Sequence, residues 1–122
     1  MTEHDGTAAI DPAAIQQLLD MTGGDPAFLD ELLDAFLEGA EQQLAEMQRA
    51  AAAHVAGDLV RPAHSLKGNA ANVGARRLEA LGRDLERDAR AGTVADAGGR
   101  IAAIAAELVA VQVDLAPYRS RP

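Results

Sequence analysis

The sequence predicts an all-α protein, an antiparallel four-helix bundle preceded by a short additional N-terminal helix. Its 122 residues fit one domain with one core. Hydrophobic residues make up 48% of the chain but aromatic residues only 2%, so we expect a core of Leu, Ile, Val and Ala in closely packed helices. Apolar residues recur at helical spacing, and no segment shows the alternation typical of strands.

The N-terminal part of the chain contains two helix-start signals. Residues 1–10 lack periodicity and are predicted to form a flexible tail. Asp11-Pro12 and Asp25-Pro26 are each typical of an N-cap followed by proline at the first helical position. The first signal begins a short helix that ends at Gly23-Gly24. The second begins a long amphipathic helix that extends to about residue 53.

The middle of the chain is predicted to form a helix that carries His64, followed by a second helix over residues 75–90. Gly57 breaks the chain first, and Asp58 is in position to cap the helix of His64. Pro62 is tolerated in a first helical turn, where the missing N–H would have no partner. Gly74 separates the two helices.

The last predicted helix follows a turn at residues 91–93. Thr93 and Asp96 resemble a capping box with Asp in place of Glu. The helix ends before Pro117, and its apolar residues alternate in steps of three and four, at Ile101, Ile104, Leu108, Val111 and Leu115. The predicted bundle domain therefore covers residues 11–117, with a C-terminal tail at 118–122.

A polar stripe on the helix of His64 is the candidate site. At about 100° per residue, His64, Lys67 and Gly68 lie on the side opposite Leu66 and the other apolar positions. A neutral imidazole is a nucleophile near neutral pH and can hold a phosphoryl group as phosphohistidine. Lys67 can offset the added negative charge, and Gly68 leaves the space beside the ring open for a reacting partner.

The run His64-Ser65-Leu66-Lys67-Gly68, followed by small residues, a hydrophobic residue and Gly74, resembles the signature of histidine-containing phosphotransfer (HPt) domains of phosphorelays. The resemblance extends over roughly residues 11–117. It implies that His64 is the phosphoacceptor. It also implies that Glu86, on the following helix, is the acceptor that orients the imidazole. We expect the docking surface to be a patch of small and aliphatic residues around His64, namely Val60, Ala71 and Ala75.

The resemblance implies a phosphorelay intermediate rather than an autonomous kinase. It would take a phosphoryl group from an aspartyl phosphate on a response-regulator receiver domain and pass it to an aspartate on another. Receiver domains and a hybrid histidine kinase are the expected partners, and Mg²⁺ is expected from the receiver, with no cofactor or metal held by this chain. Two alternatives are the N-terminal phosphoacceptor domain of a chemotaxis-type histidine kinase and a non-catalytic helical adaptor whose His64 is never phosphorylated.

Composition excludes several other classes. The formal net charge of −8 argues against a nucleic-acid partner. The absence of cysteine excludes disulfides, and the absence of a Gly-rich phosphate loop disfavours nucleotide binding. His4 and His54 have no motif around them, and no histidine pair has metal-ligand spacing. No apolar run approaches 18 residues, so we expect no membrane partner and a cytoplasmic location.

Overall fold

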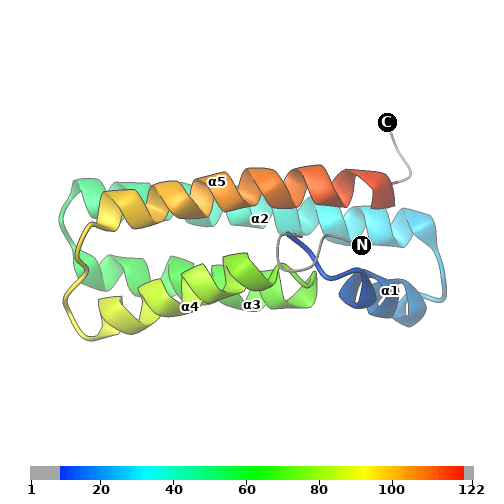
Figure 1. The fold of residues 1–122 in the computed structure, drawn as a ribbon, viewed down its shortest axis with the longest axis horizontal. Coiled ribbons are helices and arrows are strands. Elements are labelled where there is room, and N and C mark those ends of the chain that lie inside the picture. Colours follow the sequence, from blue (N-terminus) through cyan, green and yellow to red (C-terminus); the bar gives the residue numbers. More distant parts are fainter. Residues whose placement is uncertain (1–8, 120–122) are drawn as a thin grey trace, which may run out of the picture.

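The computed structural model describes residues 9–119, which form helices and no strand (Figure 1). This confirms the predicted all-α class. Two short 3₁₀ helices lie before the helix of His64 and at the end of the described chain. The elements are, in chain order, α1 (Pro12–Met21), α2 (Pro26–Ala52), η2 (Ala56–Leu59), α3 (Val60–Asn72), α4 (Arg76–Arg90), α5 (Ala97–Leu115) and η3 (Ala116–Tyr118).

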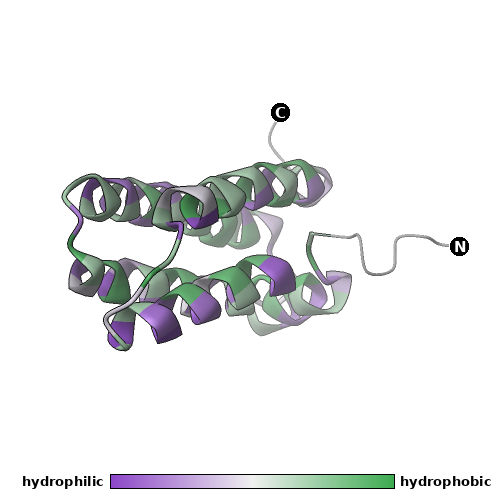
Figure 2. Cartoon of the chain, turned by 60° about the vertical axis from the view of Figure 1, so that its left-hand side comes forward, coloured by the Kyte–Doolittle hydropathy of each residue, from purple (hydrophilic) through white to green (hydrophobic). Residues whose placement is uncertain are grey.

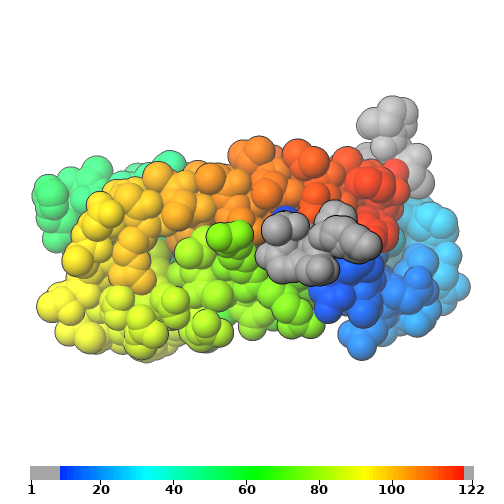
Figure 3. Space-filling model, in the orientation of Figure 1, coloured from blue at the N-terminus to red at the C-terminus, as the bar shows by residue number. Residues whose placement is uncertain are grey.

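The two long helices lie side by side above the two shorter ones. α2 and α5 form the upper row in Figure 1, α3 and α4 form the lower row, and α1 lies below the N-terminal end of α2. α2 packs against α3 and α5, and α4 also packs against α3 and α5. α2 and α4 therefore occupy diagonal corners of the bundle. The face drawn in Figure 3 is formed mainly by α4 and α5.

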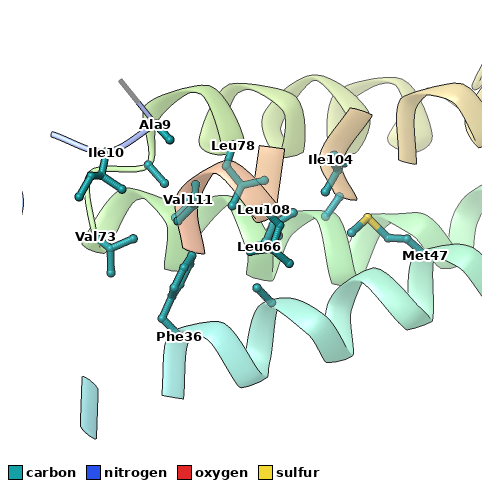
Figure 4. Packing of buried hydrophobic residues seen from close by; sticks show 14 of the residues in the cluster. Ala9, Ile10, Phe36, Met47, Leu66, Val73, Leu78, Ile104, Leu108 and Val111 are labelled. Atoms are coloured by element: carbon teal, nitrogen blue, oxygen red, sulfur yellow. The ribbon is translucent and has the colours of Figure 1, made fainter. Parts of the chain in front are cut away.

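A single aliphatic core holds the four main helices together. Figure 4 shows side chains from α2 to α5 pointing into the same interior. The apolar positions predicted for the last helix are all buried, as are Leu66 of α3 and Val73, which directly follows α3. The largest fully buried side chains are Ile15, Leu33, Met47, Leu59, Leu66, Leu78, Leu85, Ile104, Val111 and Leu115.

The first two helix starts agree with the prediction. Asp11 accepts a hydrogen bond from the Ala13 backbone N at 3.0 Å, and Asp25 accepts one from the Ala27 backbone N at 3.0 Å. In each case proline occupies the first turn, where its missing N–H leaves no unsatisfied donor. Sequence-local capping signals were sufficient at these two positions.

Two other helix starts differ from the prediction. Asp58 does not cap α3, because it lies inside η2, which continues directly into α3. The Val60 N–H is bonded to the Gly57 carbonyl instead of to a side chain. At α5 the capping residue is Asp96 rather than Thr93, and its carboxylate accepts from the Gly99 backbone N at 3.2 Å.

The predicted N-terminal tail is only partly within the described residues. Residues 1–8 lie outside them, whereas Ala9 and Ile10 are buried in the core. The Ala9 backbone N donates to Asp114 Oδ2 at 2.8 Å. The packed chain therefore includes Ala9 and Ile10, two residues that precede the predicted boundary. At the other end, Arg119 forms an ion pair with Asp34 of α2, and residues 120–122 lie outside the description.

A turn at Gly74 connects the chain start to the α3–α4 hairpin. The Asp11 backbone N donates to the Gly74 carbonyl at 2.9 Å. Gly74 has a φ of +72°, and a Cβ there would lie 2.7 Å from the Ala14 Cβ. Both the left-handed conformation and the close approach of α1 therefore require glycine.

α5 is more apolar than the sequence analysis expected. The 22-residue segment Ala97–Tyr118 contains an 18-residue window with a mean hydropathy of 1.5, so its length and composition alone would allow it to cross a membrane. In Figure 2 this helix is mostly pale or green, whereas purple segments recur along α4. The structure buries 28% of that window, and α5 supplies five residues to the core, so one helix of this kind is weak evidence for a membrane span.

Candidate functional site

His64 lies on the exposed side of α3, as the helical periodicity predicts. Its side chain is 60% exposed, while Ala63 and Leu66 on either side of it are buried. α3 begins at Val60, so Pro62 is in the first turn and His64 follows in the second. Pro62 thus removes no helical hydrogen bond, and the helix around the imidazole is continuous.

Glu86 of α4 contacts the imidazole across the gap between the two helices. Its Oε2 lies 3.0 Å from His64 Nδ1. An ionised carboxylate only accepts hydrogen bonds, so Nδ1 carries the proton and donates it. In the neutral ring, Nε2 then keeps its lone pair. The contact therefore selects the tautomer in which Nε2 carries no proton, and this nitrogen belongs to an exposed side chain.

Two cations hold the Glu86 carboxylate. Lys67 Nζ lies 2.8 Å from Oε1, and Arg90 donates to Oε2 from Nε at 3.0 Å and from Nη2 at 2.9 Å. The hydrogen bond from Lys67 is the largest influence lowering the pKa of Glu86 to about 2, and the bonds from Arg90 and His64 act in the same direction. Burial opposes them, since only 6% of Glu86 is exposed. Glu86 is therefore a carboxylate throughout the neutral range.

The sequence predicts a role at the site for Lys67 but not for Arg90. We expect Lys67 to offset phosphate charge, and in the structure its ammonium contacts Glu86 while its side chain stays 31% exposed. Arg90 is missing from the sequence-based site. The available signal is its spacing of one helical turn from Glu86, which favours a Glu–Arg pair, but several arginines occur along α4 and this spacing alone does not assign a site role.

Gly82 allows α4 to approach α3 closely. A Cβ at Gly82 would lie 3.2 Å from the Ala63 carbonyl oxygen and 3.3 Å from the Lys67 backbone N. Any side chain there would separate the two helices and increase the distance from Glu86 to His64. Gly68 has the opposite surroundings, because a Cβ at that position would meet nothing within 4 Å. The space beside His64 is open.

The expected docking patch is present only in part. Val60 is half-buried and Ala71 is exposed, but Ala75 is fully buried and contributes no surface. Ala75 precedes the first residue of α4, where the chain turns inward against the core. A groove of about 500 Å³ adjoins Ala71 and is lined by residues of α1, α2 and α3.

Of the other two histidines, only His54 lies within the described residues. It is located between the end of α2 and η2, and no hydrogen bond or ion pair joins it to Glu86, Lys67 or Arg90; His4 lies outside the described residues. Over residues 9–119, no group of three or more His, Asp or Glu side chains is arranged to hold a metal ion. Within the described chain, the carboxylate–imidazole–cation cluster is thus built from α3 and α4 only.

Comparisons with known proteins agree with this architecture. A family model described as "Hpt domain" matches residues 31–114. The chain is also similar to a solved structure, histidine-containing phosphotransfer protein B (HptB) from Pseudomonas aeruginosa PAO1. The two share 28% sequence identity with a TM-score of 0.81, covering 88% of this chain and 91% of that one. No match was found among curated proteins.

Proposed function

The chain belongs to the Hpt domain family of phosphorelay proteins, and we propose that His64 is the phosphoacceptor through which it relays a phosphoryl group between receiver-domain aspartates. The observation that supports this most directly is the 3.0 Å contact between His64 Nδ1 and Glu86 Oε2. It leaves Nε2 unprotonated on an exposed side chain. An oriented imidazole with a free, accessible nitrogen is what nucleophilic attack on phosphorus needs.

The transfer step balances as a displacement at phosphorus. The Nε2 lone pair forms the N–P bond while the P–O bond to the donor aspartate breaks, and its electrons return to the donor carboxylate. The ring then carries a positive charge with the proton still on Nδ1, where Glu86 stabilises it. Passing the group to a second receiver aspartate reverses these steps. Mg²⁺ is expected on the receiver, and no step assigned to this chain requires a metal.

The charges around His64 suit an incoming phosphoryl group. Glu86 contributes one negative charge, and Lys67 and Arg90 contribute one positive charge each. The surroundings of the neutral ring thus carry a net positive charge before transfer. We propose that Lys67 stabilises the phosphoryl group electrostatically, since it lies one turn from His64 and is partly exposed. Gly68 would provide steric access for the receiver.

Phosphorylated receiver domains provide the test. We expect acid-labile, alkali-stable phosphate to appear on the wild-type protein when it is incubated with such a receiver and Mg²⁺. The variant His64→Gln should take up none, while its helical circular dichroism and melting temperature remain close to those of the wild type, because the His64 side chain is 60% exposed. Phosphate on the variant would refute His64 as the acceptor.

The same experiment separates the alternatives. A chemotaxis-type phosphoacceptor domain would be phosphorylated by a kinase catalytic domain and ATP rather than by a phosphorylated receiver. A helical adaptor would be phosphorylated by neither. We propose receiver domains and a hybrid kinase as partners and the cytoplasm as the location, because those partners act there.

A further inference from the structure

Charge is distributed very unevenly along the chain. Residues 1–48 contain 11 of the 19 acidic residues and none of the 11 lysines and arginines. Residues 60–90, which form α3 and α4, contain 7 of the cations and 4 of the acids. The hairpin that carries His64 is therefore net positive in a protein whose formal net charge is −8.

The fold turns this sequence asymmetry into two oppositely charged sides. α2 carries most of the acidic residues of the described N-terminal half, and α4 lies diagonally across the bundle from it. Along the outer side of α4, Arg83, Arg87 and Arg90 recur at steps of four and three residues, and we call these three the arginine stripe. Their side chains are 58%, 66% and 60% exposed.

The arginine stripe lies directly beside the candidate nucleophile. Arg90 and His64 contact the same oxygen of Glu86, at 2.9 Å and 3.0 Å. Arg83 and Arg87 continue the stripe along the same exposed side of α4. They form ion pairs with neighbouring aspartates on α4 at 3.2 to 3.5 Å. Exposed pairs of this kind contribute little stability, so a partner's carboxylates can compete for the guanidinium groups at low cost.

We infer that the arginine stripe is the docking rim for the acidic surface of a receiver domain, and that it fixes the orientation in which the receiver meets His64. The inference rests on the proposed function. A receiver presents the carboxylates that bind its Mg²⁺ and accept the phosphoryl group, so its reacting surface is negative. That surface is attracted by the net-positive α3–α4 hairpin and repelled by the acidic α2, which favours approach on the α3–α4 side.

The test compares two double variants with the same net charge. Arg83→Gln/Arg87→Gln removes two charges from the arginine stripe and leaves Arg90 on Glu86. The control Gln42→Glu/Gln48→Glu adds two negative charges at exposed positions on α2. Both are two units more negative than the wild type, and glutamine and glutamate are good helix formers. Circular dichroism should show unchanged helix content in each.

The readout is the second-order rate constant of transfer from receiver domains phosphorylated with acetyl phosphate and Mg²⁺. At ~50 mM salt we expect the stripe variant to be about 3- to 10-fold slower than the wild type, and the control to be within about 2-fold. The difference should shrink at ~500 mM salt, where the Debye length is below about 5 Å.

Phosphoramidate, a small phosphoryl donor, distinguishes a failure of the proposed function from a failure of the docking inference. It should phosphorylate His64 equally in the wild type and both variants, because it does not dock on the arginine stripe. If His64 were labelled in none of the three proteins, the proposed function would be refuted. Normal labelling with equal receiver rates in all three proteins would overturn only the docking inference. Equal slowing of both double variants would also overturn it, since net charge alone would then explain the effect.

Discussion

Glu86 accepts hydrogen bonds from three side chains of α3 and α4 while it is almost completely buried. A buried carboxylate is unfavourable unless cations and donors compensate it. Here Lys67 and Arg90 provide that compensation, and Oε2, which accepts from Arg90, also accepts the hydrogen bond from the His64 imidazole. The orientation of the histidine therefore depends on a residue whose own position depends on two cations.

The lowered pKa of Glu86 predicts a specific pH dependence of stability. The folded-state pKa of about 2 lies below the ordinary value of 4.5, so Glu86 stabilises the folded protein above pH ~4.5. This contribution disappears as the pH falls through the folded-state pKa. Between pH ~4.5 and ~2, the free energy of unfolding of the wild type should fall on the order of 3 kcal/mol more than that of Glu86→Gln. Denaturant titrations at a series of pH values measure this, and parallel pH curves would contradict it.

At the residue scale, the sequence predicts most residues of this site but not all of them. His64, Lys67 and Gly68 lie within one short motif, and Glu86 is reached through the family resemblance. Arg90 is not, because its spacing from Glu86 indicates an ion pair, but only the side of α4 that meets α3 brings this pair beside His64. That orientation follows from packing across the hairpin, which helical periodicity alone does not specify.

At the scale of single helices, two glycines on facing helices have opposite surroundings. Gly68 of α3 borders open space, whereas Gly82 of α4 borders the backbone of Ala63 and Lys67. Gly68→Ala should therefore stabilise the protein by up to about 1 kcal/mol through helix propensity. Gly82→Ala should destabilise it, since separating two helices costs about 1–3 kcal/mol and exceeds that gain. Thermal unfolding of both variants tests the contrast.

The functional effect of a substitution at Gly68 should depend on the size of the new side chain. Gly68→Ala keeps the contact between His64 and Glu86 and should transfer phosphate with only a modest loss. A larger side chain, in Gly68→Gln, should fold well but transfer much more slowly at saturating receiver, because it occupies the approach to the ring. If Gly82→Ala melted at a higher temperature than the wild type, the close approach of α4 to α3 would not restrict the side chain at position 82.

Helix boundaries could be predicted where the capping signal is local and failed where it is not. Asp11 and Asp25 each cap through a backbone N–H two residues ahead, so their neighbours in sequence were sufficient. Asp58 has the same type of side chain before a helix, but a 3₁₀ turn provides the acceptors instead. Ala75 was expected on the surface, and it is buried because α4 begins only after the chain has turned into the core.

At the scale of the whole molecule, composition and periodicity predict the fold class. They do not predict that Ala9 and Ile10 contribute to the core. Ile10 is only 6% exposed, although no helical pattern includes it. Its neighbours Ala9 and Asp11 are hydrogen-bonded to Asp114 and Gly74, which are distant in sequence, so local patterns give no signal. The packed domain is thus slightly longer than its periodic part.

Truncating Ile10 tests this contribution. Ile10→Ala should destabilise the protein by about 2–4 kcal/mol, the cost of removing a buried side chain and leaving a cavity. Val113→Ala is a matched control on α5, because Val113 is 66% exposed, and it should change stability by no more than about 0.5 kcal/mol. Equal effects of the two substitutions in urea unfolding would show that the N-terminal segment does not stabilise the bundle.

The order of contacts along the chain also has a consequence for how the molecule forms. His64 and Glu86 are 22 residues apart, whereas Ala9 and its partner Asp114 are 105 residues apart. Closing a short loop costs less entropy, and local contacts form faster than distant ones. During synthesis, the α3–α4 hairpin can therefore pair before α5 has left the ribosome, while Ala9 must wait until Asp114 has emerged. The geometry around the histidine can thus be complete in a chain whose N-terminal segment has not yet docked.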